Sequence, residues 1–443
     1  MKTRTKMARI WAILAACGGV LAVGASWAGN LPVSAPARPH LPAIAAVAPA
    51  LATSLPVVLS ARIGEHSDRT RFVVELSDPV EFRVFTLANP DRVVVDMPEV
   101  LWRLQGADRP TGKGAVKSYR YGLFRPGDSR FVIDLNAPVA AVQPTILPPE
   151  GGLGYRMVID LFPTSQAKFE EAAGWPADLR AKEAAAEKVA LAPAMVRPKA
   201  SPLRARKVVV IDAGHGGIDS GTTGVDGLME KDLVLDEAKR LGAVLTQRGY
   251  AVHLTRDSDI YVPLRERVSI ARGYDADLFV SLHADSNPDP SVSGASVYTL
   301  SERGSDKEAA ALARKENQSD IIAGVDLAGQ DDAVSHILID LAQRDTMNRS
   351  AHFAQSVVGL LGRTTDVLAR TPHRSAAFVV LKAPDVPAVL VELGYLSNVQ
   401  DCDQMGTDAW REGAALALAD AVDQHFRGVP LRGSPEQAAN SAK

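Results

Sequence analysis

The chain has 443 residues, of which 46% are hydrophobic and 23% charged. This length exceeds that of one ordinary domain, and the composition is sufficient for sizeable hydrophobic cores. Residues 1–28 carry four positive charges and no negative ones, so their removal shifts the formal net charge from −3 to −7. This acidic balance argues against a nucleic-acid-binding protein.

The first 28 residues have the pattern of a secretory signal peptide. Positive charges precede an apolar stretch at residues 10–23, and residues 26–28 form a small-x-small cleavage site. Residues 14–17 also resemble a lipoprotein acylation box, but the apolar stretch before it is short and the sequence after it is still apolar, which favours ordinary cleavage. No other stretch approaches the ~20 apolar residues of a membrane-spanning helix.

Cysteine usage is consistent with export to a bacterial cell envelope. Of the two cysteines, Cys17 lies in the signal, which leaves Cys402 alone and predicts no intramolecular disulfide. An exported protein almost without cysteine fits a bacterial envelope better than it fits a disulfide-stabilised secreted domain. We therefore expect a periplasmic protein.

Residues 29–58 are rich in proline and alanine and predict an extended tether, whereas residues 59–164 have the short alternating runs of an antiparallel β domain. One six-residue phrase occurs four times in this domain, at residues 71–76, 92–97, 130–135 and 156–161. In a strand, each phrase places arginine, valine and an acid on one face and apolar groups on the other. Chance alternation accounts for two such matches more easily than for four, and the pattern indicates a duplicated pair of small sheets.

Residues 165–206 predict a partly helical linker, and residues 207–427 predict an α/β domain with a mixed sheet flanked by helices. Within this domain, residues 302–345 form a helical insertion where a compact unit would need only a turn, which is typical of a lid or regulator. Residues 428–443 predict a disordered tail. The expected strands are residues 208–212, 251–255, 278–283, 295–300, 378–381 and 388–392, and the expected helices start near Leu233 and span residues 264–272 and 408–426.

Three candidate zinc ligands lie at strand ends or in loops of the α/β domain. His215 follows the first strand, Glu230 follows its glycine-rich loop, and His283 ends another strand. Two imidazoles and one carboxylate form the ligand set of many catalytic zinc sites, which leave a fourth position for water. The set predicts a hydrolase, although no HExxH spacing supports it.

Glu392 is the candidate general base because it ends a wholly apolar strand, where an unpaired charge is costly. The alternative is that Glu392 caps a helix or pairs with a lysine. The remaining histidines are expected to pack in the core or lie at the surface, and His373 is ambiguous.

Four motifs in this order, IDAGHGG, EK, SLHAD and PAVLVELGYLSN, resemble those of the zinc-dependent N-acetylmuramoyl-L-alanine amidases, which cleave peptidoglycan. The resemblance spans residues 207–426. It implies that His215, Glu230 and His283 bind zinc and that Glu392 is the catalytic glutamate. It also implies hydrolysis of the amide bond between N-acetylmuramic acid and L-alanine during cell separation.

The β domain resembles the AMIN domain, which precedes the catalytic domain in division amidases of the AmiB and AmiC type and binds the cell wall. The sequence TRFVVELSDPVEFRVFTLANPDRVVVDM carries this second resemblance. Three positions depart from the family pattern: Asp285 replaces the usual asparagine, and Ser220 and Thr222 stand where proline and alanine are common. None of these positions is a predicted zinc ligand, but Asp285 leaves the local substrate contact open.

In amidases of this type the insertion carries a helix that blocks the site, with a glutamate that reaches the zinc. Glu316 matches that glutamate, and the alternative is that it is simply exposed on a charged helix. The resemblance implies an autoinhibited enzyme that is opened by a LytM-like envelope protein. Two other functions stay open at this stage: a wall-binding protein with an inactive amidase domain, and another zinc hydrolase of the cell wall, such as a peptidase or deacetylase.

Overall fold

The structure is a computed structural model, and it describes residues 55–104, 112–141, 144–191, 206–325 and 341–427. The predicted signal peptide with Cys17, most of the predicted tether and the predicted tail lie outside these residues. The described residues all belong to one compact unit.

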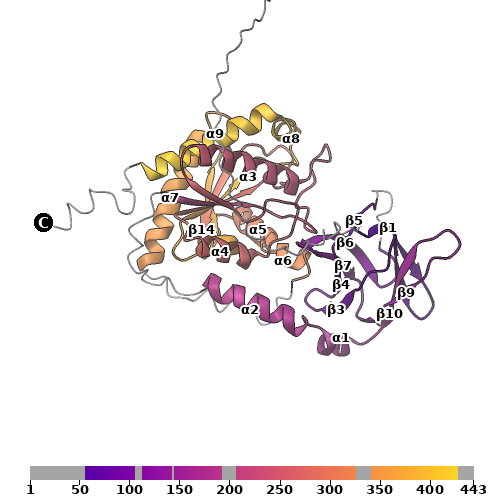
Figure 1. The fold of residues 1–443 in the computed structure, drawn as a ribbon. Coiled ribbons are helices and arrows are strands. Elements are labelled where there is room, and N and C mark those ends of the chain that lie inside the picture. Colours follow the sequence, from indigo (N-terminus) through magenta and orange to yellow (C-terminus); the bar gives the residue numbers. More distant parts are fainter. Residues whose placement is uncertain (1–54, 105–111, 142–143, 192–205, 326–340, 428–443) are drawn as a thin grey trace, which may run out of the picture. The chain divides into compact units, whose positions relative to one another are not determined.

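The β domain consists of two sheets whose strands are antiparallel except for the pair β1 and β5 (Figure 1). One has the order β5-β1-β2-β10-β8, with β9 paired to β10, and the other has the order β3-β4-β7-β6. The first strand begins at Val57, two residues inside the predicted tether. The strands are β1 (Val57–Glu65), β2 (Thr70–Leu76), β3 (Arg83–Leu87), β4 (Arg92–Pro98), β5 (Leu101–Trp102), β6 (Val116–Arg125), β7 (Asp128–Leu135), β8 (Val139–Ala141), β9 (Thr145–Leu147) and β10 (Tyr155–Pro163).

The four repeated phrases all form strands, and they pair two by two. The first and fourth pair in β2 and β10, and the second and third pair in β4 and β7. Alternate residues such as Phe72, Val74, Phe131 and Ile133 point into one core between the two sheets. The prediction of a duplicated pair of sheets is confirmed, and the arginine of each phrase lies on the outer face.

Helices α1 and α2 follow the β domain and lead to the α/β domain. Strand β11 is buried along its whole length and is apolar except for Asp212, as expected for the centre of a sheet covered on both faces. The elements are α1 (Gln166–Ala172), α2 (Ala177–Leu191), β11 (Val208–Ala213), α3 (Glu230–Gln247), β12 (Ala251–Leu254), α4 (Leu264–Gly273), β13 (Leu278–His283), β14 (Ser296–Leu300), α5 (Lys307–Glu316), α6 (Ser319–Ile322), α7 (Leu341–Leu361), β15 (His373–Ala376), the 3₁₀ helix η3 (Val379–Leu381), β16 (Ala388–Glu392), α8 (Val399–Met405) and α9 (Asp408–Phe426).

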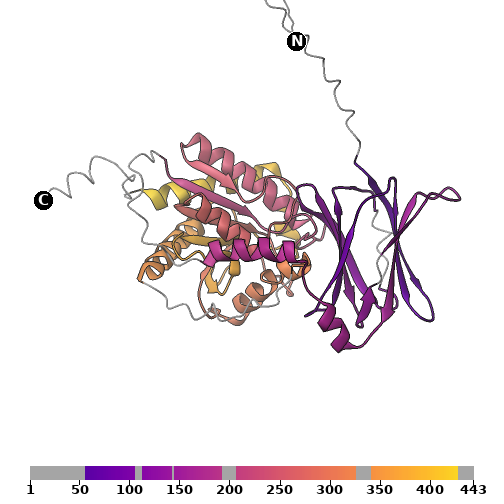
Figure 2. The same cartoon turned by 60° about the horizontal axis from the view of Figure 1, so that its bottom comes forward.

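The sheet of the α/β domain has the order β12-β11-β13-β16-β14-β15, with one antiparallel pair, β14 and β16, among parallel ones. The predicted mixed sheet flanked by helices is therefore confirmed. Figure 2 shows helices on both faces of this sheet. The carboxyl ends of β11, β13 and β16 lie side by side at one edge, where ligands bind in α/β folds.

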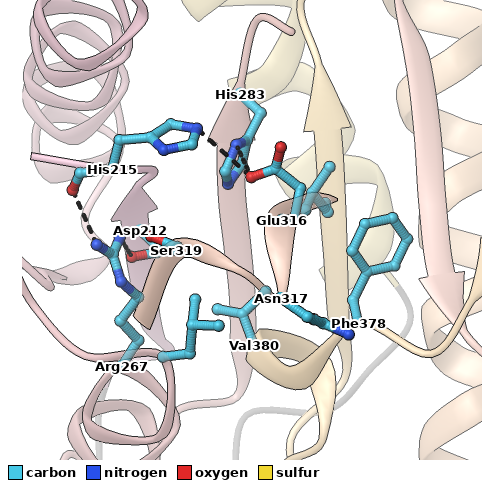
Figure 3. Close-up of a pocket in the computed structure, with 11 residues that line it drawn as sticks. Asp212, His215, Arg267, His283, Glu316, Asn317, Ser319, Phe378 and Val380 are labelled. Carbon is cyan, nitrogen blue, oxygen red and sulfur yellow. Dashed lines mark hydrogen bonds and ion pairs between the residues drawn. The ribbon is translucent and has the colours of Figure 1, made fainter. Parts of the chain in front are cut away.

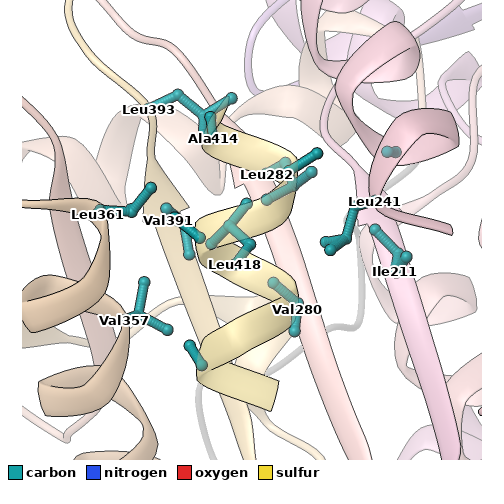
Figure 4. Close-up of a cluster of buried hydrophobic side chains, with 14 of the residues drawn as sticks. Ile211, Leu241, Val280, Leu282, Val357, Leu361, Val391, Leu393, Ala414 and Leu418 are labelled. Carbon is teal, nitrogen blue, oxygen red and sulfur yellow. The ribbon is translucent and has the colours of Figure 1, made fainter. Parts of the chain in front are cut away.

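One face of the sheet packs against α3, α7 and α9. Figure 4 shows Leu282 and Val391 of the sheet in contact with this layer, where Leu241, Leu361 and Leu418 come from the three helices. The opposite face of the sheet forms a second core with α4, α5 and η3. The two cores hold the ends of the central strands in fixed positions.

One predicted strand is wrong. Residues 378–381 were expected to form a strand of the sheet. The strand in this part of the chain, β15, instead ends at Ala376, and Val379–Leu381 forms a 3₁₀ helix. Short apolar runs do not distinguish a strand from a buried turn of helix. Within the described ranges, none of the helices combines the length and hydrophobicity needed to cross a bilayer.

Candidate active site

His215 lies two residues beyond the end of β11, in a loop with an uncommon backbone conformation. Its φ is 57°, a left-handed value that costs a non-glycine residue energy and occurs often at functional sites. The backbone carbonyl oxygen of His215 accepts a hydrogen bond from Arg267 Nη2 at 2.8 Å. Gly216 and Asp219 close the loop by exchanging two backbone hydrogen bonds. The loop thereby fixes the direction of the imidazole.

Two glycines allow the candidate ligands to approach one another. A Cβ atom on Gly214 would lie 2.5 Å from the imidazole of His283. At Gly221, where φ is +63°, a Cβ would lie 2.6 Å from Glu230 Oε2 and 2.7 Å from His215 Cδ2. Only glycine leaves room for the three side chains at these two positions.

Asp219 orients His215 from behind. Its Oδ2 lies 2.9 Å from His215 Nδ1, and its Oδ1 accepts the backbone N–H of Gly221 at 3.1 Å. Burial alone would raise the pKa of Asp219, but the charge and hydrogen bond of His215 outweigh it, and the pKa falls to about 2. Because Nδ1 faces this carboxylate, Nε2 is the nitrogen that His215 presents to the site.

Glu230 is the first residue of α3, where the helix dipole favours a negative charge. Its Oε2 accepts the backbone N–H of Thr222 at 2.9 Å, and its Oε1 accepts that of Ala284 at 2.9 Å. The same Oε1 lies 3.1 Å from His215 Nε2 and 3.2 Å from His283 Nδ1. The carboxylate is thus anchored between the two imidazoles.

His283 and Glu392 are the last residues of β13 and β16, and they are register partners. Glu392 is fully buried, and its Oε2 accepts the backbone N–H of Asp285 at 3.0 Å. Among the described residues, its Oε1 has no hydrogen-bond partner, and the side chain neither caps a helix nor bonds a lysine. Burial, together with the carboxylates of Glu230 and Glu316, raises the pKa of Glu392 well above its usual value.

Glu316, the last residue of α5, points into the same site. Its side chain is 5% exposed, and Oε2 lies 3.2 Å from His283 Nδ1 and 3.4 Å from His215 Nε2. Figure 3 shows Glu316 and the two imidazoles converging. One ligand atom from each of the three residues lies within 4.8 Å of the other two. Glu316 is therefore not simply exposed on a charged helix.

The donor set fits a bound cation. Burial would lower the pKa of His215, but the surrounding carboxylates, first those of Glu230 and Asp219, raise it well above its usual value. Although two carboxylates lie near His215 Nε2, this atom has no hydrogen-bond partner among the described residues. A divalent metal ion would satisfy both the lone pair of the imidazole and the negative charge around it.

The residues next to Glu316 add further contacts over the site. Lys315 Nζ forms an ion pair with Asp285 and lies 3.1 Å from Thr222 Oγ1, which itself donates to Asp285 at 2.9 Å. The hydroxyl of Ser319 donates to Asp219, the carboxylate behind His215. We call residues 315–325 the covering segment. Three of its residues, Lys315, Glu316 and Ser319, contact the site.

Comparison with known proteins identifies the family. Residues 209–424 match the N-acetylmuramoyl-L-alanine amidases, and residues 58–153 match the AMIN domain. The amidase AmiC of Escherichia coli O6:H1 is 34% identical over 375 residues, which cover 83% of this chain and 89% of that protein. AmiC of Neisseria meningitidis serogroup B is 34% identical over 403 residues, or 88% and 95% of the two chains. The chain belongs to the N-acetylmuramoyl-L-alanine amidase family.

A solved structure, the amidase AmiC2 of Nostoc punctiforme, is 29% identical, covers 50% of this chain and 97% of its own, and gives a TM-score of 0.36. The predicted enzyme class and the resemblance to an AMIN domain are confirmed by the family matches. This amidase is a hydrolase that acts on the bond between N-acetylmuramic acid and L-alanine of peptidoglycan.

The amidase brings together all five residues that the sequence analysis singled out: His215, Glu230, His283, Glu392 and Glu316. Sequence reasoning missed three further residues that shape the site, namely Asp219, Arg267 and Lys315. The position of Asp219, four residues after His215 in a glycine-rich loop, is a signal that could have identified it. Arg267 comes from a distant helix where no local pattern marks it, and Lys315 directly precedes the predicted Glu316.

Proposed function

We propose that this amidase is a zinc enzyme in which His215, Glu230 and His283 hold the metal. Support comes from the convergence of two imidazole nitrogens on the anchored carboxylate of Glu230, at the carboxyl edge of the sheet. When bound in such a site, zinc lowers the pKa of water to about 7 and polarises a carbonyl group.

Glu392 is proposed as the proton carrier of the reaction. Its unpaired Oε1 lies in a buried environment that raises its pKa toward the range useful for general acid–base catalysis. Glu392 takes a proton from the attacking water and delivers it to the nitrogen of L-alanine. A C–O bond forms at the lactyl carbonyl and the C–N bond breaks, which leaves a muramoyl carboxylate and a free amino terminus.

A digest of purified sacculi tests this mechanism. Mass spectrometry should find intact muramic acid and free L-alanine amino termini, and Glu392→Gln should reduce their release by a factor of ~100 or more, since general acid–base catalysis contributes 10²–10⁴-fold. Glu412→Gln, an exposed glutamate on α9, is the control. Release by Glu392→Gln at the wild-type rate would refute its role as the proton carrier.

We further propose that the covering segment inhibits the enzyme. Glu316 lies where substrate would meet the two histidines, Lys315 neutralises Asp285, and Ser319 bonds Asp219. The segment must leave for a stem peptide to enter. A partner from the cell envelope, of the LytM-like class, is the proposed activator, and the exported protein is proposed to act in the periplasm during cell separation.

Glu316→Ala tests the inhibition. Loss of a charged contact worth about 1.5–3 kcal/mol shifts the closed-to-open equilibrium by ~10-fold or more, so hydrolysis without activator should rise accordingly. Glu308→Ala, on the same helix and paired with Arg374 at the surface, is the matched control. An unchanged rate for Glu316→Ala would rule out the inhibitory role.

Location and activation have their own measurements. Cell fractionation should recover the protein with the periplasmic contents after removal of about 28 residues, and recovery with the cytoplasm would refute export.

Addition of a LytM-domain protein from the same envelope should accelerate hydrolysis by the wild type but not by Glu316→Ala. Equal acceleration of both proteins would refute opening of the covering segment as the activation step.

A further inference from the structure

The covering segment is held from a second side by the β domain. Carbonyl oxygens at its end accept hydrogen bonds from arginines on the outer face of sheet β3-β4-β7-β6. Arg92 Nη1 donates to Ile321 O at 2.7 Å. Arg130 Nη1 donates to Ala323 O at 3.0 Å and to Gly324 O at 3.1 Å.

Two further donors complete these contacts. Arg120 donates through Nε to Ile322 O and through Nη2 to Ile321 O at 3.4 Å. Trp175, between α1 and α2, donates through Nε1 to Gly324 O at 3.1 Å. Side chains outside the α/β domain thus bind the four successive carbonyls of residues 321–324, and of these Ile321 O also accepts the backbone N–H of Gly324. We call Arg92, Arg120 and Arg130 the arginine face.

The arginine face is preorganised. Arg130 is 0% exposed, and Asp96 binds it through both carboxylate oxygens, at 2.5 and 2.9 Å. Its guanidinium carbon also lies 3.5 Å from the ring centroid of Phe124. Arg120 pairs with Asp134 through one nitrogen, Nη1, and one carboxylate oxygen. Little side-chain entropy remains to be lost when these donors bind the covering segment.

Apolar side chains also pack where the covering segment meets sheet β3-β4-β7-β6. Ala323 and Val325 share a buried cluster with Val94 and Val132 of the sheet. At Gly324, φ is +72°, and a Cβ would lie 2.9 Å from Val132 Cγ2 and 3.2 Å from Val94 Cγ2. The backbone of the covering segment therefore lies directly on the sheet, and only glycine fits at residue 324.

The other sheet provides an internal comparison. It carries the same repeated phrase, and Arg71 pairs with both oxygens of Asp160 at 2.7 Å, much as Arg130 pairs with Asp96. Within the described ranges, Arg71 interacts with residues of the β domain, Asp160 and Asp68. Only one of two duplicated arginine-bearing faces is therefore occupied by the covering segment.

We propose that the arginine face of the β domain is a binding site for residues 321–324 and keeps the covering segment over the active site. The β domain is then part of the inhibitory device and not only a separate wall-binding module. This inference rests on the proposed inhibition by Glu316. Any event that separates the arginine face from residues 321–324 weakens the closure and favours release of Glu316 from the two histidines.

The test uses full-length Arg92→Gln and Gly324→Ala. The first removes one donor, and the second lifts the segment from the sheet without removing a charge. Arg71→Gln is the matched control on the other sheet. Amide hydrogen exchange of peptides within residues 315–325 should accelerate about tenfold in Arg92→Gln, as expected for the loss of one hydrogen bond to a charged group. It should also accelerate in Gly324→Ala, because the added methyl group clashes with Val132, and should not change in the control.

Hydrolysis of sacculi without activator is measured on the same proteins and on Glu316→Ala. A rise in Arg92→Gln, Gly324→Ala and Glu316→Ala supports the inference. Unchanged exchange, or a rise in Glu316→Ala alone, overturns the role of the arginine face and leaves the proposed inhibition intact. No rise in any variant, with exchange accelerated, overturns both proposals.

Discussion

At the scale of single residues, the site is built by contacts that restrict two histidines. His215 adopts a left-handed backbone, and Arg267 holds its carbonyl oxygen while Asp219 holds Nδ1. His283 needs no such support because it is the last residue of a central strand. A loop ligand must therefore be fixed by its neighbours, whereas a strand ligand is fixed by the sheet.

Asp219→Asn tests this dependence. The amide retains the shape but not the charge that orients and polarises His215, and loss of such a partner typically costs 10–100-fold in metal affinity. Zinc affinity, measured by competition with a chelating dye, should fall by a factor of ~10 or more. Asp289→Asn, on an exposed loop where the carboxylate bonds only Ser291 among the residues described, is the control. Equal affinity in Asp219→Asn and wild type would exclude the orienting role.

At the scale of elements, the sequence predicted strands and helices well where the periodic pattern of apolar residues ran over a long segment or occurred several times. The four phrases became β2, β4, β7 and β10, and the predicted strand at residues 278–283 is β13 as observed. The exception is the short run at residues 378–381, which is too brief for its period to exclude a turn of 3₁₀ helix.

The convergence of the site residues could be predicted from the sequence, but hydrogen bonds from side chains to the backbone of distant elements could not. The motifs place His215, Glu230, His283 and Glu392 at strand ends and loops, from which convergence follows by topology. The backbone carbonyls that Arg130 binds, by contrast, lie 193 and 194 residues away, and every residue type has such a carbonyl. A pattern of side chains contains no information about such acceptors.

Helix α3 contains a buried glutamate outside the active site. We expect this residue to make the stability of the protein depend on pH. Glu237 is fully buried, and neither of its carboxylate oxygens has a hydrogen-bond partner among the described residues. Burial raises its pKa to about 8, and Asp236 adds to the effect. Between pH ~4.5 and ~8 the unfolded carboxyl is ionised while the folded one is protonated, so this residue makes stability fall as pH rises through that window.

Glu237→Gln removes this titration. Its free energy of unfolding should therefore decline less than that of the wild type between pH 6 and pH 8, by up to ~1.4 kcal/mol per pH unit. Urea denaturation at the two pH values provides the comparison, with exposed Glu412→Gln as the control. Parallel declines in the wild type and Glu237→Gln would show that Glu237 is not protonated in the folded protein.

At the scale of the whole molecule, one buried cluster joins segments that a division into domains would separate. Val94 and Val132 come from the β domain, Trp175 from the connection, Ile218 from the loop of His215, and Ala323 from the covering segment. Their burial removes apolar surface of all four segments from water at once. The closed enzyme should therefore unfold as a cooperative unit and not domain by domain.

Val132→Asp tests this cooperativity, with Val73→Asp as its counterpart at the same position of the repeated phrase in the other sheet, where the side chain is partly exposed. A carboxylate at residue 132 enters the shared cluster without a partner and opposes its closure. Calorimetry should show one transition for the wild type and Val73→Asp but two for Val132→Asp, because the β and α/β domains then unfold separately. A single transition in all three proteins, shifted alike, would mean that the cluster does not couple the domains.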